Sequence, residues 1–423
     1  MNKGIRVGLG GDARSSDGGA RRPGWARVTH GAIGSGLVAA VMLVAGPPAG
    51  CAAPAEPPQE EEKPAVVHSE ASIKVADDRE EGEDESAAMD EAHRRFRARL
   101  PKMRAIQERF EETLLTHEAL ASVGIGLAED GATPVFKVIV TSPELERELP
   151  RSFEGVAVHV RLGEHAFLAD GGPDCNGGMG PPCHREQLPL PVEMGNSGAW
   201  FQGTACSMGF KACDLELGSS VIVTNSHCAQ YTGCNLAGIN DPFKHVGPMD
   251  EMVAGSAVNI GTIAGHAAPS CGGLNNYTDA TKVESAFFQS SKNHRDIGTP
   301  KHEIIDPVPG WGVQYSGRTT GHNTGTIDAV NVTVMVPVVG GFCCGALTMK
   351  DQISFTPKYA IQGGDSGSGV LLRRRLAPQY DRRIAGLLFA GGPGIGYFNS
   401  IGRVMSALDL TFDFTQCGFP DDY

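Results

Sequence analysis

The spacing of hydrophobic residues predicts a long amphipathic helix near the start of the ordered chain. From Asp90 to about His117, apolar residues recur at steps of three and four positions, as on one face of a helix. These residues are Phe96, Leu100, Met103, Ile106, Phe110 and Leu114. Pro101 falls inside the pattern and should break or kink the helix, because proline has no N–H and clashes with the preceding turn.

A small α+β domain over residues 89–170 is predicted from this helix and the segments after it. Three short apolar runs read as strands: SVGIGL, PVFKVIV and GVAVHVRL. Between the second and third, SPELERELP starts with a serine suited to cap a short helix. The glycine- and proline-rich stretch 171–193 is then a linker, which a Cys175–Cys183 disulfide would pin.

The pattern changes over residues 194–423 to short apolar runs divided by glycine, asparagine and proline. The runs are SVIVTN, VESAFF, VNVTVMVPVV, QISF, GVLLR and IAGLLFA. Many short strands with turn signals between them predict an all-β sandwich or barrel. The final stretch with helical periodicity is SIGRVMSALDL.

The net charge of −13 is concentrated in one segment. Residues 56–90 hold 13 acidic and 3 basic residues, a net of −10, which leaves −3 for the rest of the chain. Residues 52–88 are therefore expected to be a disordered acidic tether. The remainder has no basic patch, so no nucleic-acid partner is expected.

Residues 1–51 have the features of an export signal. The basic residues Arg21, Arg22 and Arg27 precede the apolar run Ala32–Gly46, which is shorter than the roughly 20 residues of a membrane span. The stretch PPAGCAAPA is similar to a bacterial lipobox, in which Cys51 would be lipidated and would anchor the protein to a membrane. An ordinary cleaved signal peptide is the alternative. Both predict a periplasmic, outer-membrane or extracellular protein.

Export changes how the cysteines are interpreted. Apart from Cys51, the sequence holds ten, and an even number in an oxidising compartment favours disulfides. No C-x-x-C pair occurs, so no metal site is expected, and no motif indicates another cofactor.

Two segments carry candidate chemistry. QGGDSGSGV places Ser366 among four glycines, and SSVIVTNSHCAQ places His227 just after a predicted buried strand. Serine is a poor nucleophile until a base accepts its proton, and histidine suits this role because its pKa lies near neutrality.

Together these segments resemble the chymotrypsin-like serine proteases. Thr224–Cys228 matches the T-x-x-H-C motif of that family, and Gly364–Gly367 matches G-D-S-G. GRTTGHNTGTI and IAGLLFAGG are similar to two further segments of its bacterial branch, and the preceding α+β domain resembles an N-terminal region found in a subgroup. The resemblance implies two six-stranded antiparallel β-barrels and a monomeric endopeptidase that acts on peptides or proteins.

The resemblance also implies individual roles. Ser366 would be the nucleophile and His227 the base, while the N–H groups of Gly364 and Ser366 would form the oxyanion hole. Phe389, Ala390 and Gly391 would bind an extended substrate through their main chain.

Three acids compete for the third place in the triad. The family has an aspartate at the start of an apolar strand, and alignment on that motif and on the later Gly-Thr-Pro puts Glu284 there. Asp296 and Asp279 are the alternatives. The glutamate is one methylene longer than the family's aspartate, so a catalytically impaired protein that acts as a binding module is the runner-up function. An esterase ranks last, because no G-x-S-x-G elbow is present.

Two structural pairings follow from the same resemblance. Asp365 would be buried and would need a cation, which in the bacterial branch is the arginine of G-R-T-T-G, here Arg318. Cys206 lies on the strand before the histidine strand, which predicts a Cys206–Cys228 disulfide.

Overall fold

The computed structural model describes residues 82–168, 184–203, 205–230, 236–270, 273, 275–337, 346–376 and 379–420. The predicted export signal, Cys51 and the Cys175–Cys183 disulfide lie outside these residues. None of the helices in the described ranges is long and apolar enough to cross a membrane.

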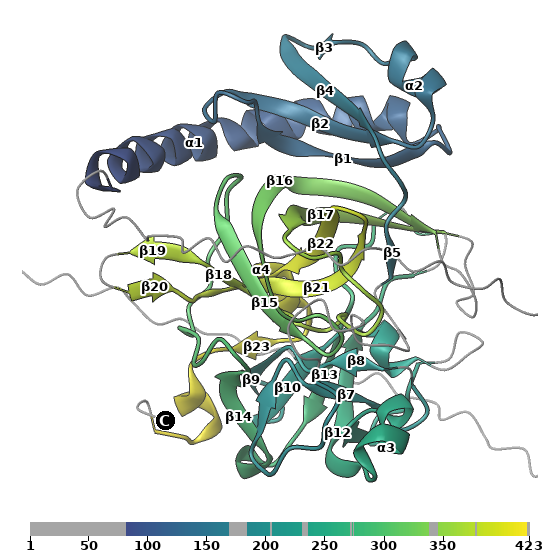
Figure 1. Cartoon of the computed structure of the whole chain (residues 1–423), viewed down its shortest axis with the longest axis vertical. Coiled ribbons are helices and arrows are strands. Elements are labelled where there is room, and N and C mark those ends of the chain that lie inside the picture. The colour runs from purple at the N-terminus through teal and green to yellow at the C-terminus, as the bar shows by residue number, and fades with distance from the viewer. Residues whose placement is uncertain are drawn as a thin grey trace, which may run out of the picture. The chain divides into compact units, whose positions relative to one another are not determined.

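The described residues form far more strands than helices (Figure 1). Its N-terminal part consists of α1 (Gly82–Leu114), β1 (Leu120–Leu127), β2 (Pro134–Val140), α2 (Pro143–Glu148), β3 (Ser152–Phe153), β4 (Val156–Leu162) and β5 (Phe167–Leu168). Next come β6 (Val192–Met194), β7 (Ser197–Trp200), β8 (Cys206–Ser207), β9 (Phe210–Asp214), β10 (Ser219–Thr224), β11 (Pro242–His245), α3 (Pro248–Ala254), β12 (Val258–Ala267), β13 (Ala280–Glu284) and β14 (Ser290–His294). The rest comprises β15 (Gly312–Gly317), β16 (Gly321–Pro337), β17 (Ala346–Pro357), β18 (Gly369–Leu372), β19 (Arg374–Leu376), β20 (Gln379–Asp381), β21 (Ile384–Gly392), β22 (Ile395–Ser400), α4 (Ile401–Ala407) and β23 (Leu410–Thr411).

The N-terminal part has the elements that the hydrophobic pattern predicts. The buried residues of α1 include Phe96, Ile106 and Phe110, and Ser142 caps α2 through its side chain. Two details differ from expectation. Helix α1 begins at Gly82, so the end of the predicted tether is helical, and it continues through Pro101. Burial of the apolar face on β1 and β2 offsets the hydrogen bond that proline removes.

Two large sheets form the rest of the fold, which is mainly β as predicted. One has 8 strands, in the order β23-β9-β10-β13-β12-β11-β7-β8. The other has 11 strands rather than the expected six, because β1 pairs antiparallel with β16. The strands of the N-terminal part therefore continue the second sheet of the C-terminal region.

A shared hydrophobic cluster joins the two sheets. Phe210 and Val221 come from the 8-stranded sheet, Leu371 and Leu387 come from the 11-stranded sheet, and all four have no exposed surface. Fully burying an aliphatic or aromatic side chain stabilises a fold by roughly 1.5–3 kcal/mol, so this cluster fixes one sheet against the other. Strand β10, which precedes His227, and strand β18, which follows Ser366, both contribute to this cluster.

The predicted strand VESAFF is placed differently. Strand β13 ends at Glu284, and a 3₁₀ turn at Phe287–Gln289 follows it. The strand occupies Ala280–Glu284 because β10 pairs with it on one side and β12 on the other.

Candidate active site

His227 lies where the sequence predicts, just after a central strand. Strand β10 ends at Thr224, and His227 begins a short 3₁₀ turn, His227–Ala229, in which all three residues are buried. The predicted Cys206–Cys228 disulfide is present and ties this turn to β8. The imidazole is therefore held by the strand on one side and by the disulfide on the other.

Asp279 is the acid that faces His227. Its Oδ2 lies 2.5 Å from His227 Nδ1, and its Oδ1 accepts the N–H groups of Ser226 at 2.9 Å and His227 at 3.2 Å. The Ser226 hydroxyl donates to the same oxygen. Only 1% of the Asp279 surface is exposed. Every oxygen of the buried carboxylate is thus hydrogen-bonded, which is what a buried charge requires.

The surroundings of Asp279 favour its ionised form. Burial works to raise the pKa of Asp279, but the His227 imidazole, the Ser226 hydroxyl and the His227 N–H together hold it below its usual range. An ionised carboxylate only accepts hydrogen bonds, so Nδ1 of His227 carries the proton. The Nε2 atom of a neutral imidazole then has the lone pair that a general base needs.

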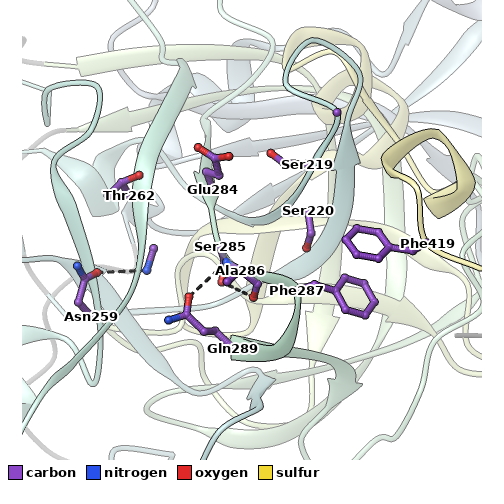
Figure 2. Close-up of a pocket in the computed structure, with 12 residues that line it drawn as sticks. Ser219, Ser220, Asn259, Thr262, Glu284, Ser285, Ala286, Phe287, Gln289 and Phe419 are labelled. Carbon is purple, nitrogen blue, oxygen red and sulfur yellow. Dashed lines mark hydrogen bonds between the residues drawn. The ribbon is translucent and has the colours of Figure 1, made fainter.

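Glu284, the acid predicted from sequence, lies at the other end of β13, and that prediction is wrong. Five residue steps of about 3.3 Å put it roughly 16 Å from Asp279 along the strand. It is exposed and lines a separate pocket with Ser220, Asn259 and Thr262 (Figure 2). The alternative Asp296 bonds His184 Nε2 at 2.9 Å instead.

Strand direction explains the error. In an antiparallel pair, the start of one strand lies beside the end of the other. The register Thr224↔Thr281 shows this for β10 and β13, so the acid had to stand just before β13. Alignment on VESAFF treated Glu284 as the start of a strand that in fact ends there. The dipeptide Asp279–Ala280, directly before a fully buried run, was the signal for the correct assignment.

The Ser366 loop connects β17 to β18, and two of its glycines are required by geometry. Gly364 has φ +97° and Gly367 has φ +88°, values that favour glycine. A Cβ on Gly364 would lie 2.5 Å from Thr319 Oγ1, and one on Gly367 would collide with Ser207 O and Thr224 Oγ1. The loop therefore packs tightly against both sheets.

Asp365 anchors this loop, although its partners differ from the prediction. Its Oδ1 accepts the N–H groups of Thr319 at 3.1 Å and Thr320 at 2.9 Å, and its Oδ2 accepts the N–H of Gln362 at 3.1 Å. No ion pair with Arg318 occurs within the described ranges. Burial raises the pKa of Asp365 to about 6, against these backbone donors.

Arg318 instead forms a bidentate ion pair with Asp250, which the sequence did not reveal. Its Nε and Nη2 lie 2.6 and 2.5 Å from the two carboxylate oxygens, and neither side chain is exposed. Ser197 and Arg185 each donate to Asp250 at 2.6 Å. Burial works to raise the pKa of Asp250, but Arg318 and Ser197 keep it below its usual range. Asp250 lies in the first turn of helix α3, far from any recognisable motif, so only the fold reveals this pair.

Ser366 and His227 lie on facing loops. The Ser366 carbonyl accepts the N–H of Ser207 at 2.8 Å and lies 3.9 Å from the sulfur of Cys228, the residue after His227. A ring nitrogen of His227 lies within 4.8 Å of that same sulfur. The Ser366 hydroxyl donates to Phe389 O at 3.0 Å. The structure thus brings together His227, Ser366 and the first of the predicted substrate-binding residues.

The predicted substrate-binding residues form one segment of a buried strand. Phe389, Ala390 and Gly391 lie near the end of β21, and β22 pairs with the Ala390–Gly391 part on one side. On the other side, β5 pairs with Ala390 and Gly391. A peptide would therefore find that side already occupied.

The cysteines near the site are not free ligands. Cys206, His227 and Cys228 lie within 4.8 Å of one another, but the two sulfurs are bonded to each other and cannot act as thiolates. A second disulfide, Cys213–Cys417, ties β9 to the C-terminal turn. Spacing alone could not have revealed that pair.

No family model matches the chain, and no curated protein matches it. Three similar solved structures are proteases. Thermobifida fusca Protease A is 20% identical, with 52% of this chain and 98% of that protein covered and a TM-score of 0.35. Cellulomonas bogoriensis chymotrypsin is 19% identical, with coverages of 52% and 98% and a TM-score of 0.33. Nocardiopsis protease is 20% identical, with the same coverages and a TM-score of 0.35.

Proposed function

We propose that this chain is a serine endopeptidase in which Ser366, His227 and Asp279 form the triad. The observation that carries the proposal is the 2.5 Å contact between His227 Nδ1 and Asp279, in a loop that also contacts the Ser366 main chain. The proposal rests on the geometry of the site and not on the three similar solved structures, which are 19–20% identical with TM-scores of 0.33–0.35.

The chemistry follows from these positions. Ser366 Oγ attacks the peptide carbonyl while its proton passes to His227 Nε2, and Asp279 stabilises the imidazolium that forms. The proton then goes to the leaving amine as the C–N bond breaks, which leaves an acyl-enzyme ester. Water attacks that ester by the same route and releases the acid.

The backbone N–H groups of Gly364 and Ser366 would bind the oxyanion of the tetrahedral intermediate. Among the hydrogen bonds of the described residues, none uses the N–H of Gly364 or Ser366 as its donor. The N–H groups of Asp365, Gly367 and Ser368 are all used within the fold. Losing one oxyanion donor typically slows catalysis by about 10²–10³.

The orienting acid weakens the case for the runner-up function. The binding-module alternative was motivated by a glutamate in the triad, and Asp279 removes that motive. Export remains part of the proposal, and the two disulfides support it, because disulfides persist in oxidising compartments.

Peptide hydrolysis tests the function. The purified chain and its Ser366→Ala and His227→Ala variants are incubated with a diverse peptide mixture, and new termini are found by mass spectrometry. We expect cleavage by the wild type and loss of it in both variants. Equal cleavage by all three proteins would contradict the proposal. So would the absence of cleavage both in the wild type and in the Leu168→Asp variant, which is described in the next subsection.

A further inference from the structure

Strand β5 pairs with the strand segment to which the substrate is assigned. It is antiparallel to β21, with Leu168 opposite Ala390 and Phe167 opposite Gly391. The contact extends further along the strand, since a Cβ on Gly392 would lie 3.8 Å from His165 O and 4.0 Å from Phe167 Cε1. An extended peptide that adds to a sheet edge makes this kind of pairing.

The partners along this side of β21 lead directly from the nucleophile loop to β5. Leu387 pairs with Gly369, and Leu388 exchanges hydrogen bonds with the loop through Ser368 O and Gly367 N. The next carbonyl, that of Phe389, accepts the Ser366 hydroxyl. Immediately beyond it, Ala390 and Gly391 pair with β5. In a peptide bound like β5, the residue after the Leu168 position would stand opposite Phe389, beside the nucleophile.

Burial at the site agrees with an occupied cleft. Ser366 has no exposed surface and His227 only 4%. Leu168, 7% exposed, belongs to one apolar cluster with Phe389 and Tyr397. A hydroxyl without exposed surface cannot reach a peptide carbonyl from solution, so the segments that cover the site must move before a substrate binds.

The short tether favours the internal segment over any external peptide. Only the four residues between Leu162 and Phe167 separate β4 from β5. The sheet that contains β4 is itself fixed to the C-terminal region by the β1–β16 pairing. A short tether raises the effective concentration of a bound segment to about the millimolar range, above that of a typical dilute substrate.

We propose that the segment His165–Leu168 occupies the peptide-binding edge of β21 and holds the peptidase in a self-inhibited state. This regulation rests on the function proposed above. While β5 is in place, the Phe389 carbonyl holds the Ser366 hydroxyl and Ala390 and Gly391 are paired. When β5 leaves, a substrate N–H takes the Phe389 carbonyl and releases the hydroxyl towards His227.

The test compares two leucines of the N-terminal part in the full-length chain. Leu168→Asp places a charge in the apolar cluster at β21, whereas the control Leu162→Asp alters a leucine that is 50% exposed at the end of β4. Peptidase activity should rise by about 10- to 100-fold in Leu168→Asp, the factor by which burial of one leucine shifts an equilibrium. Leu162→Asp should match the wild type.

Amide hydrogen exchange separates this inference from the function it rests on. In the Ser366→Ala background, residues 384–392 should exchange faster with Leu168→Asp than with Leu162→Asp, whether or not the chain is an enzyme. Self-inhibition is overturned if Leu168→Asp leaves the exchange of residues 384–392 unchanged, or if it has the same peptidase activity as the wild type. In either case, cleavage that is lost with Ser366→Ala still supports the peptidase function. Faster exchange without any cleavage overturns the peptidase, and self-inhibition with it. Leu168→Ala repeats the comparison if the charged variant fails to fold.

Discussion

Two buried aspartates lie at the proposed site, one bonded to His227 and one next to Ser366, and their environments differ. Asp279, before β13 of the 8-stranded sheet, faces an imidazole, and its pKa is held below the usual range despite burial. Asp365, in the loop before β18 of the 11-stranded sheet, has backbone N–H groups and the Thr320 side chain as its partners, and burial raises its pKa to about 6. Both have almost no exposed surface.

The difference shows which of the two can serve a triad. The acid of a triad has to hydrogen-bond the base, so that it can stabilise the positive charge that forms on that base. Asp279 has such a partner in His227. Asp365 instead joins its own loop to the Thr319–Thr320 turn, so its role is to hold Ser366 in place. Arg318, the cation that the sequence predicts for Asp365, pairs instead with Asp250, a third buried aspartate.

The largest expected effect is on Asp279. Asp279→Asn should lower kcat by roughly 10⁴-fold with little change in KM, because an amide no longer fixes the productive His227 tautomer. Initial rates on a peptide substrate with the opened Leu168→Asp chain provide the measurement. Glu284→Gln in the same chain is the matched control and should leave kcat unchanged. A large loss with Glu284→Gln would reverse the assignment of the acid.

The next effect concerns which acid Arg318 supports. Arg318→Met should lower the free energy of unfolding by about 3–5 kcal/mol, because the buried Asp250 carboxylate loses its bidentate partner and is left with Arg185 and Ser197. Urea denaturation measures the loss, and a double-mutant cycle identifies the partner. We expect strong coupling between Arg318→Met and Asp250→Asn, and near-additivity with Asp365→Asn. Coupling to Asp365 alone would restore the pairing predicted from sequence.

The smallest effect is a pH dependence at Asp365. Its folded pKa of about 6 lies above the usual 3.8, so its contribution to stability is fully present below pH 3.8 and is lost as the pH rises through about 6. The free energy of unfolding of the wild type, relative to Asp365→Asn, should therefore fall by about 3 kcal/mol between pH 4 and pH 7. Chemical denaturation across this range measures the difference, and a flat difference would contradict the raised pKa.

Local patterns in the sequence predicted most single elements correctly. Periodicity indicated helix α1, while the runs PVFKVIV and IAGLLFAGG coincide with β2 and β21. Cys206–Cys228 was also expected, and it lies in the turn that holds His227. These features depend on residues close in sequence or on a motif of the resembling family.

The predictions that failed depend on how distant segments pair. The place of Glu284 changed because β13 starts at Ala280, a boundary set by pairing with β10 and β12. Arg318 pairs with Asp250, 68 residues away in sequence, and not with Asp365, which belongs to the family's motif. Likewise, no local pattern shows that β5 lies on β21, because two residues make too short a strand signal.

The most direct test of the triad is to map the residue that a fluorophosphonate labels in the Leu168→Asp chain. The account predicts a single adduct on Ser366, found by mass spectrometry of the digested protein. Labelling should slow strongly with His227→Ala and Asp279→Asn and should keep its rate with Glu284→Gln. An adduct on another serine, or no adduct in a chain whose residues 384–392 exchange freely, would contradict the proposed nucleophile.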